Sequence, residues 1–285
     1  METIRLAIQA KGRLNEESIA LLADAGISIE ESKRKLLAKS GDFPIEVLYL
    51  RDDDIPQAVS MGVADIGIVG LNEVAEKPYE VDVVHKLGFG GCRLSLAVPK
   101  AEQYDSPKWF DGKRIATSYP KILERYFKEN GISAEIHEIA GSVEVAPLVG
   151  MADAIFDIVS SGGTLVKNGL VEVVKVMDSE AVLIANKQMS AEKKKIVDQI
   201  LFRFSAVERS KGMKYVLMNL PCDKVDEAVK ILPGMKSPTI LALAQEGWCS
   251  LHVVIRDSEL WEKIEGLKAI GAEDILVLSL EKMIL

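Results

Sequence analysis

Hydrophobic and polar positions up to about residue 180 alternate between short β-rich runs and segments with the helical period. A helix is expected after the first run, with Asn15 as its N-cap and Gly26 past its end, and another over Pro120–Asn130. This alternation predicts an α/β fold with largely parallel sheets. The expected strands are Ile4–Gln9, Ile45–Arg51, Asp65–Val69, Arg93–Val98, Arg114–Ala116, Ala134–Ile139 and Ala154–Val159.

The pattern changes after a long amphipathic segment, Ala191–Lys211. The remaining residues predict the order βαββαβ, which is the ferredoxin-like arrangement. This tail holds no cluster of catalytic residue types, so we interpret it as a regulatory or assembly module, with a purely structural oligomerisation domain as the alternative. Its expected elements are Tyr215–Leu220, Lys224–Ile231, Thr239–Ala244, Ser250–Ile255, Ser258–Ile270 and Ile275–Leu280.

Two stretches of the α/β part are similar to each other. DIPQAVSMGVADIGIVG (54–70) and EVAPLVGMADAIFDIVSSG (144–162) share an early proline, Gly-x-Ala-Asp and an Ile-Val strand that ends in glycine. They indicate either two similar α/β lobes or two ordinary αβ units. Two lobes would place a ligand in the cleft between them, at the carboxyl ends of strands.

Composition excludes several classes of protein. The 285 residues suffice for two or three domains, and a net charge of −8 without a basic stripe argues against a nucleic-acid partner. No apolar run approaches the ~20 residues that span a bilayer, and METIRLAIQAKGR lacks the layout of a signal peptide. The cysteines, Cys92, Cys222 and Cys249, are odd in number and scattered. They predict neither a disulfide framework nor a metal cluster, so a reducing cytoplasm is the expected location.

The stretch FDIVSSGGTLVKNGL (156–170) carries the strongest sign of chemistry. A buried strand ends in two serines, two glycines and a threonine directly before a helix. Such a loop exposes backbone N–H groups to an anion, usually a phosphate. The Walker pattern and the dinucleotide fingerprint are absent, so the loop suits one terminal monophosphate, while a plain glycine-rich turn is the alternative. The expected phosphate contacts are Ser160, Ser161, Gly162, Gly163 and Thr164.

Charged residues near strand ends complete the expected site. Asp153, Asp157 and Glu144 precede the loop, and carboxylates there can accept hydrogen bonds from ribose hydroxyls. Lys11, Arg13 and Arg51 follow the first two strands, where guanidinium groups are suited to bidentate phosphate binding. Each residue taken alone is also compatible with a turn residue or a solvated surface charge.

Several long segments resemble one family. RDDDIP, FGGCRLSLAVP, GKRIATSYP, GSVEVAPLVGMADAIFDIVSSGGTL and LPGMKSPTI are similar to the long form of ATP phosphoribosyltransferase, in the same order and nearly end to end. The resemblance implies the first step of histidine biosynthesis, in which ATP and phosphoribosyl pyrophosphate (PRPP) give phosphoribosyl-ATP and pyrophosphate, with Mg²⁺ required. The metal would be held mainly by substrate phosphates rather than by protein ligands.

The resemblance also implies an architecture. Two lobes like those of type II periplasmic binding proteins would comprise residues 1–93 with 182–211 and residues 94–181, followed by a regulatory domain over 212–285. That domain would bind histidine as feedback inhibitor through Asn219 and Thr239, and the chain would assemble as a homo-hexamer built from dimers.

Catalysis would depend on aligning the substrates and stabilising the departing pyrophosphate. Lys11, Arg13 and Arg51 are the expected charge stabilisers. The expected ATP contacts are Lys11, Gly12, Arg13, Asp65 and Arg93.

Two other classes stay open from the sequence. A two-lobed small-molecule-binding protein without catalysis would bind and close without turnover, and it would normally carry a signal peptide or lipid anchor. A transcription regulator would need a DNA-binding helix pair or a basic face, which the sequence does not display.

Overall fold

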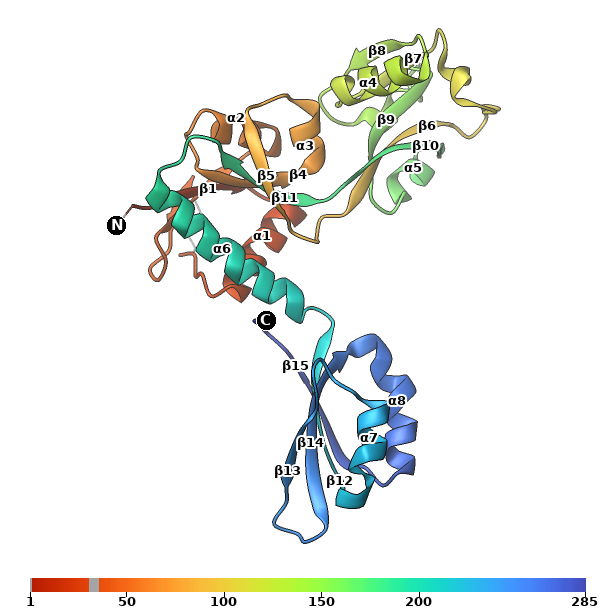
Figure 1. The fold of residues 1–285 in the computed structure, drawn as a ribbon. Coiled ribbons are helices and arrows are strands. Elements are labelled where there is room, and N and C mark those ends of the chain that lie inside the picture. Colours follow the sequence, from red (N-terminus) through yellow and green to blue (C-terminus); the bar gives the residue numbers. More distant parts are fainter. Residues whose placement is uncertain (1, 31–35) are drawn as a thin grey trace. The chain divides into compact units, whose positions relative to one another are not determined.

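The computed structural model describes residues 2–30 and 36–285. Two compact units make up the chain, Met1–Gln199 and Ile200–Leu285, and the boundary between them lies inside α6 (Ala191–Ser210). This boundary lies twelve residues before the one predicted at 211/212 from the sequence. Within the described residues the strands form three sheets, two in the first unit and one in the second (Figure 1).

The first sheet and the helices α1, α2 and α3 form what we call lobe I. Its strand order is β2-β3-β1-β4-β11-β5. Strand β1 is parallel to β3 and β4, so the carboxyl ends of these three strands lie at one edge. The bounds are β1 Ile4–Gln9, α1 Arg13–Asp24, β2 Leu37–Lys39, β3 Ile45–Leu50, α2 Ile55–Ser60, β4 Ile66–Gly70, α3 Leu71–Glu76, β5 Val81–Lys86 and β11 Ala181–Asn186.

The second sheet, with α4 and α5, forms lobe II. Its order is β10-β6-β9-β7-β8, and β7 is parallel to β8 and β9. One face packs with α4 around Phe110, Phe127 and Phe156, and the other packs Ile155 and Val159 beneath α5. The bounds are β6 Cys92–Pro99, β7 Arg114–Thr117, α4 Pro120–Asn130, β8 Glu135–Glu138, β9 Ala154–Val159, α5 Gly163–Lys167 and β10 Leu170–Ser179.

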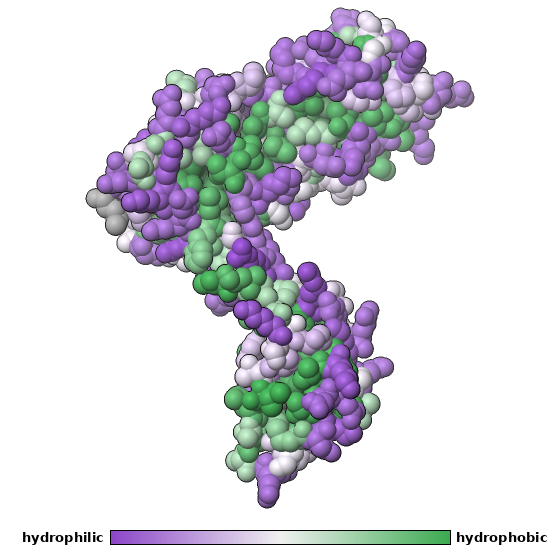
Figure 2. Space-filling view, viewed as in Figure 1, coloured by the Kyte–Doolittle hydropathy of each residue, from purple (hydrophilic) through white to green (hydrophobic). Residues whose placement is uncertain are grey.

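The second unit confirms the predicted βαββαβ order. Its sheet order, β13-β14-β12-β15, and its two helices form the ferredoxin-like arrangement, and Val216, Leu251 and Val253 pack in its core. The opposite face of the sheet is less covered, and Figure 2 shows apolar residues over the strand side of this unit. The bounds are β12 Met213–Pro221, α7 Val225–Ile231, β13 Thr239–Ala242, β14 Trp248–Arg256, α8 Asp257–Ala269 and β15 Glu273–Ser279.

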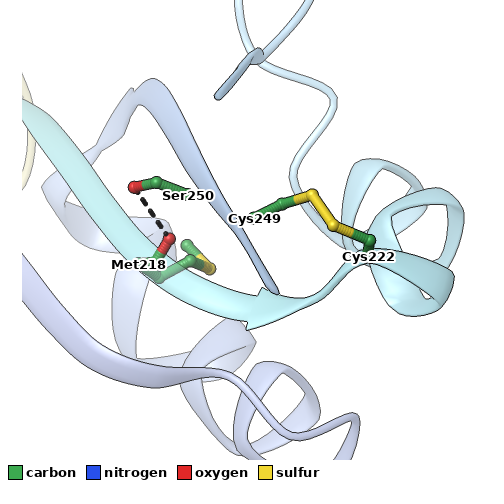
Figure 3. Close-up of a disulfide and its surroundings, with 4 residues drawn as sticks. All are labelled: Met218, Cys222, Cys249 and Ser250. Atoms are coloured by element: carbon green, nitrogen blue, oxygen red, sulfur yellow. Dashed lines mark hydrogen bonds between the residues drawn. A yellow bond between two sulfur atoms is a disulfide. The ribbon is translucent and has the colours of Figure 1, made fainter. Parts of the chain in front are cut away.

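A disulfide in the second unit contradicts the expectation from cysteine usage. Cys222 and Cys249 are bonded, with their Cα atoms 5.2 Å apart (Figure 3). The register of β12 against β14 places Leu220 opposite Cys249, so Cys222 just beyond β12 comes within reach. A separation of 27 residues gave no sign of this pairing, because strand register is not visible in cysteine spacing.

Most elements of the α/β part occur close to their predicted positions, but the sheets are mixed rather than largely parallel. Strands β6, β10 and β11 run antiparallel to their neighbours. Strands β2, β5, β10 and β11 were not predicted, nor was α3. Helix α1 begins at Arg13 with Gly12 as N-cap, so Asn15 is not its cap; its amide donates instead to the Gln9 carbonyl (2.7 Å). Within residues 2–30 and 36–285, no helix has the length and apolar character needed to cross a membrane.

Candidate active site

The glycine loop lies at the carboxyl end of β9. The strand ends at Val159 and α5 begins at Gly163, with Gly162 at φ 79° as its N-cap. This left-handed conformation favours glycine because it strains residues with a Cβ atom. Ser160, Ser161, Gly163 and Thr164 are exposed. The loop therefore presents its backbone and hydroxyl groups to solvent, although Thr164 lies inside the helix rather than capping it.

Asp157 lies two residues before the end of β9. Its Oδ1 accepts a hydrogen bond from the backbone N–H of Ile158 (2.8 Å). Burial raises the pKa of Asp157 from 3.8 to about 6, and the negative charge of Glu144 adds to the shift. The structure thus places Asp157 three residues before Ser160, with Glu144 close enough for its charge to affect Asp157.

A pocket in the first unit brings the loop together with lobe I. Ser160 and Ile158 of lobe II line it, and so do Arg13 and Asp52 of lobe I. The remaining lining residues come from β1, α1, β4, α3, the first residues of β6 and β11, and the segment that leads into β6. They are Gln9, Leu14, Glu17, Gly70, Asn72, Glu73, Gly90, Gly91, Cys92 and Ala181. The pocket is therefore the cleft expected at the carboxyl ends of β1 and β4.

The predicted cations lie on this edge of lobe I. Lys11 and Arg13 follow β1, and Arg51 follows the neighbouring parallel strand β3. The Arg13 side chain is 71% exposed and its Nε donates to Glu17 Oε1 (3.0 Å). Arg51 is 77% exposed and forms an ion pair with Asp53 (3.3 Å). Lys11 is exposed as well, so all three cations can reorient toward a bound anion.

Two predicted carboxylates are not part of this group. Asp65 precedes β4, at the amino end of the strand, where it binds Lys193 Nζ (2.8 Å) and the backbone N–H of Arg5 (2.9 Å). Asp153 precedes β9 and forms an ion pair with Arg114 (2.8 Å). Since β9 has six residues, Asp153 lies about 20 Å along the strand from the loop. Both side chains therefore have protein partners at the amino ends of their strands, away from the phosphate loop and the cations, and the structure gives no support to the contacts predicted for them.

Arg93 is near the loop, but its contacts differ from those expected of an ATP ligand. Its Nε and Nη2 donate to the two carboxylate oxygens of Glu172, and its Nη1 donates to the Ser160 carbonyl (3.0 Å). The Glu172 carboxylate also accepts from Ser95 Oγ (2.8 Å). Arg93 therefore already has an anionic partner inside lobe II.

Sequence reasoning missed a buried polar network between the lobes. The Tyr119 hydroxyl, at the start of α4, donates to Glu73 Oε1 (2.9 Å) and accepts from the Asn72 amide (3.2 Å). Asn72 also contacts Ser179 through its backbone N–H (3.0 Å) and its side-chain oxygen (2.8 Å). Burial raises the pKa of both Glu73 and Tyr119. No local sequence pattern indicates this network, because its members come from α3, α4 and β10.

A second contact ties the same two helices. The carboxylate of Glu76, on α3, accepts from the backbone N–H groups of Lys121 (2.8 Å) and Ile122 (3.0 Å) at the start of α4. A carboxylate there is stabilised because the first N–H groups of a helix have no partner within it. Arg125 of α4 donates in turn to the Ala75 carbonyl (2.9 Å). These bonds hold the lobes in one arrangement around the pocket.

The predicted inhibitor residues lie on one face of the second unit's sheet. Thr239 is opposite His252, which is opposite Leu217, and Asn219 lies two residues further along β12. Residues at even spacing share a face, so Thr239 and Asn219 point to the same side. Asn219 donates to Asp274 Oδ2 (3.1 Å), and Thr239 is exposed.

Comparison with known proteins identifies the family. Residues 51–206 match the family model for ATP phosphoribosyltransferase, and residues 210–282 match that of the HisG C-terminal domain. The chain belongs to the ATP phosphoribosyltransferase family. It is 60% identical over 281 residues to the ATP phosphoribosyltransferase of Bacteroides thetaiotaomicron, covering 99% of each chain. The Bacteroides fragilis enzyme of the same name is 58% identical over 282 residues, covering 99% of this chain and all of that one. The protein is thus a transferase of this family, as predicted.

Solved structures agree with the fold. A chain of the ATP phosphoribosyl transferase (HisG:HisZ) complex from Thermotoga maritima superposes with a TM-score of 0.62 at 30% identity, over 71% of this chain and 96% of that one. A periplasmic binding protein of an ABC transporter from Brucella ovis, with glutathione bound, gives a TM-score of 0.50 at 12% identity, over 80% and 73%. The second likeness concerns the fold alone. Together they confirm the two-lobed α/β architecture of the transferase.

Proposed function

We propose that the transferase condenses ATP with PRPP to give 1-(5-phosphoribosyl)-ATP and pyrophosphate, the first step of histidine biosynthesis. In this reaction a ring nitrogen of adenine bonds to the anomeric carbon. The bond from that carbon to the pyrophosphate oxygen breaks, and the pyrophosphate leaves with the electron pair. The transition state is therefore cationic at the ribose and anionic at the leaving group.

The phosphate loop would hold the 5-phosphate of PRPP. Ser160, Ser161, Gly162, Gly163 and Thr164 supply exposed backbone N–H and hydroxyl donors. Asp157 and Glu144 would accept hydrogen bonds from the ribose hydroxyls, because Asp157 lies two residues before the end of β9 and Glu144 is close enough to raise its pKa.

Lobe I would bind ATP and the leaving pyrophosphate. Arg13 lines the pocket, and Lys11 and Arg51 flank it on the loops after neighbouring strands. Their exposed side chains can move onto the departing oxygens, where a charge stabiliser of this kind contributes on the order of 10²–10³ in rate. Gly12, at the start of α1, would let the nucleotide approach the backbone closely.

Mg²⁺ fits this arrangement as a metal carried by the substrate. Among residues 2–30 and 36–285, no group of three or more His, Cys, Asp or Glu side chains is placed to ligate a metal. Mg²⁺ usually binds one or two carboxylates together with phosphate oxygens and water. Asp52, which lines the pocket, would be the carboxylate, and the bound metal would neutralise charge on the pyrophosphate.

One observation carries the proposal: Ser160 of the phosphate loop, Arg13 and Asp52 line a single pocket. The test is a coupled assay of pyrophosphate release. We expect release only when ATP, PRPP and a divalent cation are all present. Binding of either substrate without pyrophosphate release would instead support the alternative, a two-lobed binding protein without catalysis.

We also propose that the second unit binds histidine as a feedback inhibitor through Thr239 and Asn219, and that the transferase assembles as a homo-hexamer built from dimers. The support is the common sheet face of the two residues together with the family resemblance. A Thr239→Ala variant is expected to keep its activity and lose inhibition by histidine. Undiminished inhibition after removal of residues 212–285 would refute the regulatory role, and sedimentation velocity tests the hexamer. A cytoplasmic location stays a prediction, and the disulfide removes the cysteine argument for it.

A further inference from the structure

Arg93, on β6, connects the phosphate loop that follows β9 to the strand on the other side of β6, which is β10. In the order β10-β6-β9, Arg93 lies on the middle strand. Its Nε and Nη2 bind Glu172 of β10, while its Nη1 donates 3.0 Å to the carbonyl of Ser160, the first residue after β9. Three N–H groups of one planar guanidinium are thus fixed on two strands at once.

The anionic end of this link is itself held in place. Ser95 Oγ donates to the Glu172 carboxylate (2.8 Å), and Ser95 is only 1% exposed. Strand register places Ser95 opposite Asp157, and Arg93 opposite Val159. Arg93, Ser95 and Asp157 therefore share the sheet face that also lies beneath α5. The guanidinium lies beside the proposed ribose phosphate site, where the Arg93 side chain is 30% exposed and its N–H groups are bonded to protein oxygens.

Fixing the Ser160 carbonyl also fixes the next N–H group. The peptide unit is planar and trans, so the Ser161 N–H points opposite to the Ser160 carbonyl. The carbonyl is turned toward Arg93 in the sheet. The Ser161 N–H therefore points away from Arg93, and Ser161 itself is exposed.

We propose that Arg93 is a positioning residue for the phosphate loop: with Glu172 it orients the Ser160–Ser161 peptide so that the Ser161 N–H is ready to bind the 5-phosphate of PRPP. The inference rests on the proposed function and replaces the expected contact between Arg93 and ATP. Since Glu172 already balances its charge, Arg93 is poorly suited to bind a further triphosphate.

The two roles predict different kinetics. For Arg93→Met we expect KM for PRPP to rise roughly 10- to 100-fold, the effect of one hydrogen bond to a charged group, with KM for ATP within about twofold of wild type. Glu172→Gln should also raise KM for PRPP, but by a smaller factor than Arg93→Met. The double variant should be no worse than Arg93→Met alone, because the two side chains act through one link. Arg93→Lys should have a KM for PRPP between those of wild type and Arg93→Met, since an ammonium cannot make the planar three-point contact.

The chain offers a matched control. Arg114 binds both carboxylate oxygens of Asp153 (2.8 and 3.3 Å) and donates to the Gly150 carbonyl (3.1 Å), the same pattern at the other end of β9. Arg114→Met should leave both KM values unchanged while costing similar stability in urea unfolding. A shared fall in activity would therefore indicate a purely structural effect.

Three results would overturn the proposal. They are a rise in KM for ATP alone, unchanged kinetics in Arg93→Met and Glu172→Gln, or equal kinetic losses in the Arg114→Met control. If Arg93→Met does not fold, Arg93→Lys and Glu172→Gln must still show the selective rise in KM for PRPP. Failure of the proposed function is a separate result, because it would appear as no pyrophosphate release by the wild-type protein.

Discussion

Replacing Asp157 by asparagine should make the first unit more stable and the enzyme less active. Burial, with a contribution from Glu144, raises the pKa of Asp157 from 3.8 to about 6 in the folded chain. Ionising this carboxyl therefore costs more in the folded state than in the unfolded state, and wild-type stability falls as pH rises from about 4 to about 6, then levels off. Asparagine keeps an oxygen to accept from the Ile158 N–H, but it carries no charge.

The size of the effect follows from the shift. About two pKa units correspond to about 3 kcal/mol at pH 8, about 1.5 kcal/mol at pH 5 and about 0.5 kcal/mol at pH 4. Urea unfolding followed through Trp109, which packs against Phe110 in lobe II, measures this difference when Trp248 and Trp261 are replaced by phenylalanine. Over the same range, kcat/KM of wild type for PRPP should fall below pH 6, and Asp157→Asn should lose this acidic limb together with roughly 10- to 100-fold of its activity.

A control residue directly before the same strand, Asp153, should respond with the opposite sign. Arg114 lowers the pKa of Asp153, so ionised Asp153 stabilises the folded chain, and Asp153→Asn should lose stability at pH 8. This loss should disappear as the pH falls through the native pKa. An Asp157→Asn variant that is no more stable than wild type at pH 8, or whose gain persists unchanged at pH 4, would refute the reasoning.

Three further predictions concern the loop, the lobes and the second unit. Gly163→Glu should reduce kcat/KM for PRPP at least about 100-fold by placing a carboxylate in the phosphate site, whereas Gly163→Ala should stay active because a Cβ there meets nothing nearer than 3.6 Å; equal rates would refute the loop assignment. Tyr119→Phe should cost about 1–3 kcal/mol in thermal or urea unfolding, because it removes one of the two donors to Glu73 Oε1 and leaves only the Asn72 amide, and an unchanged midpoint would contradict the network. Reducing the Cys222–Cys249 disulfide should destabilise the second unit by about 3.5 kcal/mol, given its 27-residue separation, while a Cys222→Ser variant should be insensitive to reductant.

The local sequence pattern predicted those elements whose formation depends on residues close together in the chain. The strand over Ala154–Val159 and the helix over Pro120–Asn130 occur with the predicted bounds, because hydrophobic period, an early proline and a closing glycine act within a few residues. The glycine loop was recognisable for the same reason. Strand β10 was missed although residues 171–178 are rich in β-branched side chains, since register shifts at Glu172 and Lys175 interrupt the regular alternation.

The sequence did not predict which side chains from distant segments contact one another. Asp65 and Asp153 bind Lys193 and Arg114, which lie 128 and 39 residues away in the chain. Arg93 was expected to face ATP, and its carboxylate partner lies 79 residues away. Strand order and register create these pairings, and no local signal reports them. The three-dimensional fold was therefore needed to decide which charged side chains lie at the site.

The surroundings of Arg93 favour its charge, whereas those of Asp157 disfavour its charge, and this difference suits the proposed chemistry. Arg93 is matched by Glu172, so it shapes the loop without adding a strong local field. Asp157 is affected by burial and by Glu144, both of which disfavour its charge before substrate binds. PRPP would bring hydroxyl donors to these carboxylates, and positive charge then develops on the ribose as pyrophosphate leaves. The unfavourable interaction of the resting site is thus relieved more in the transition state than in the ground state, which is the condition for an interaction to accelerate the chemical step.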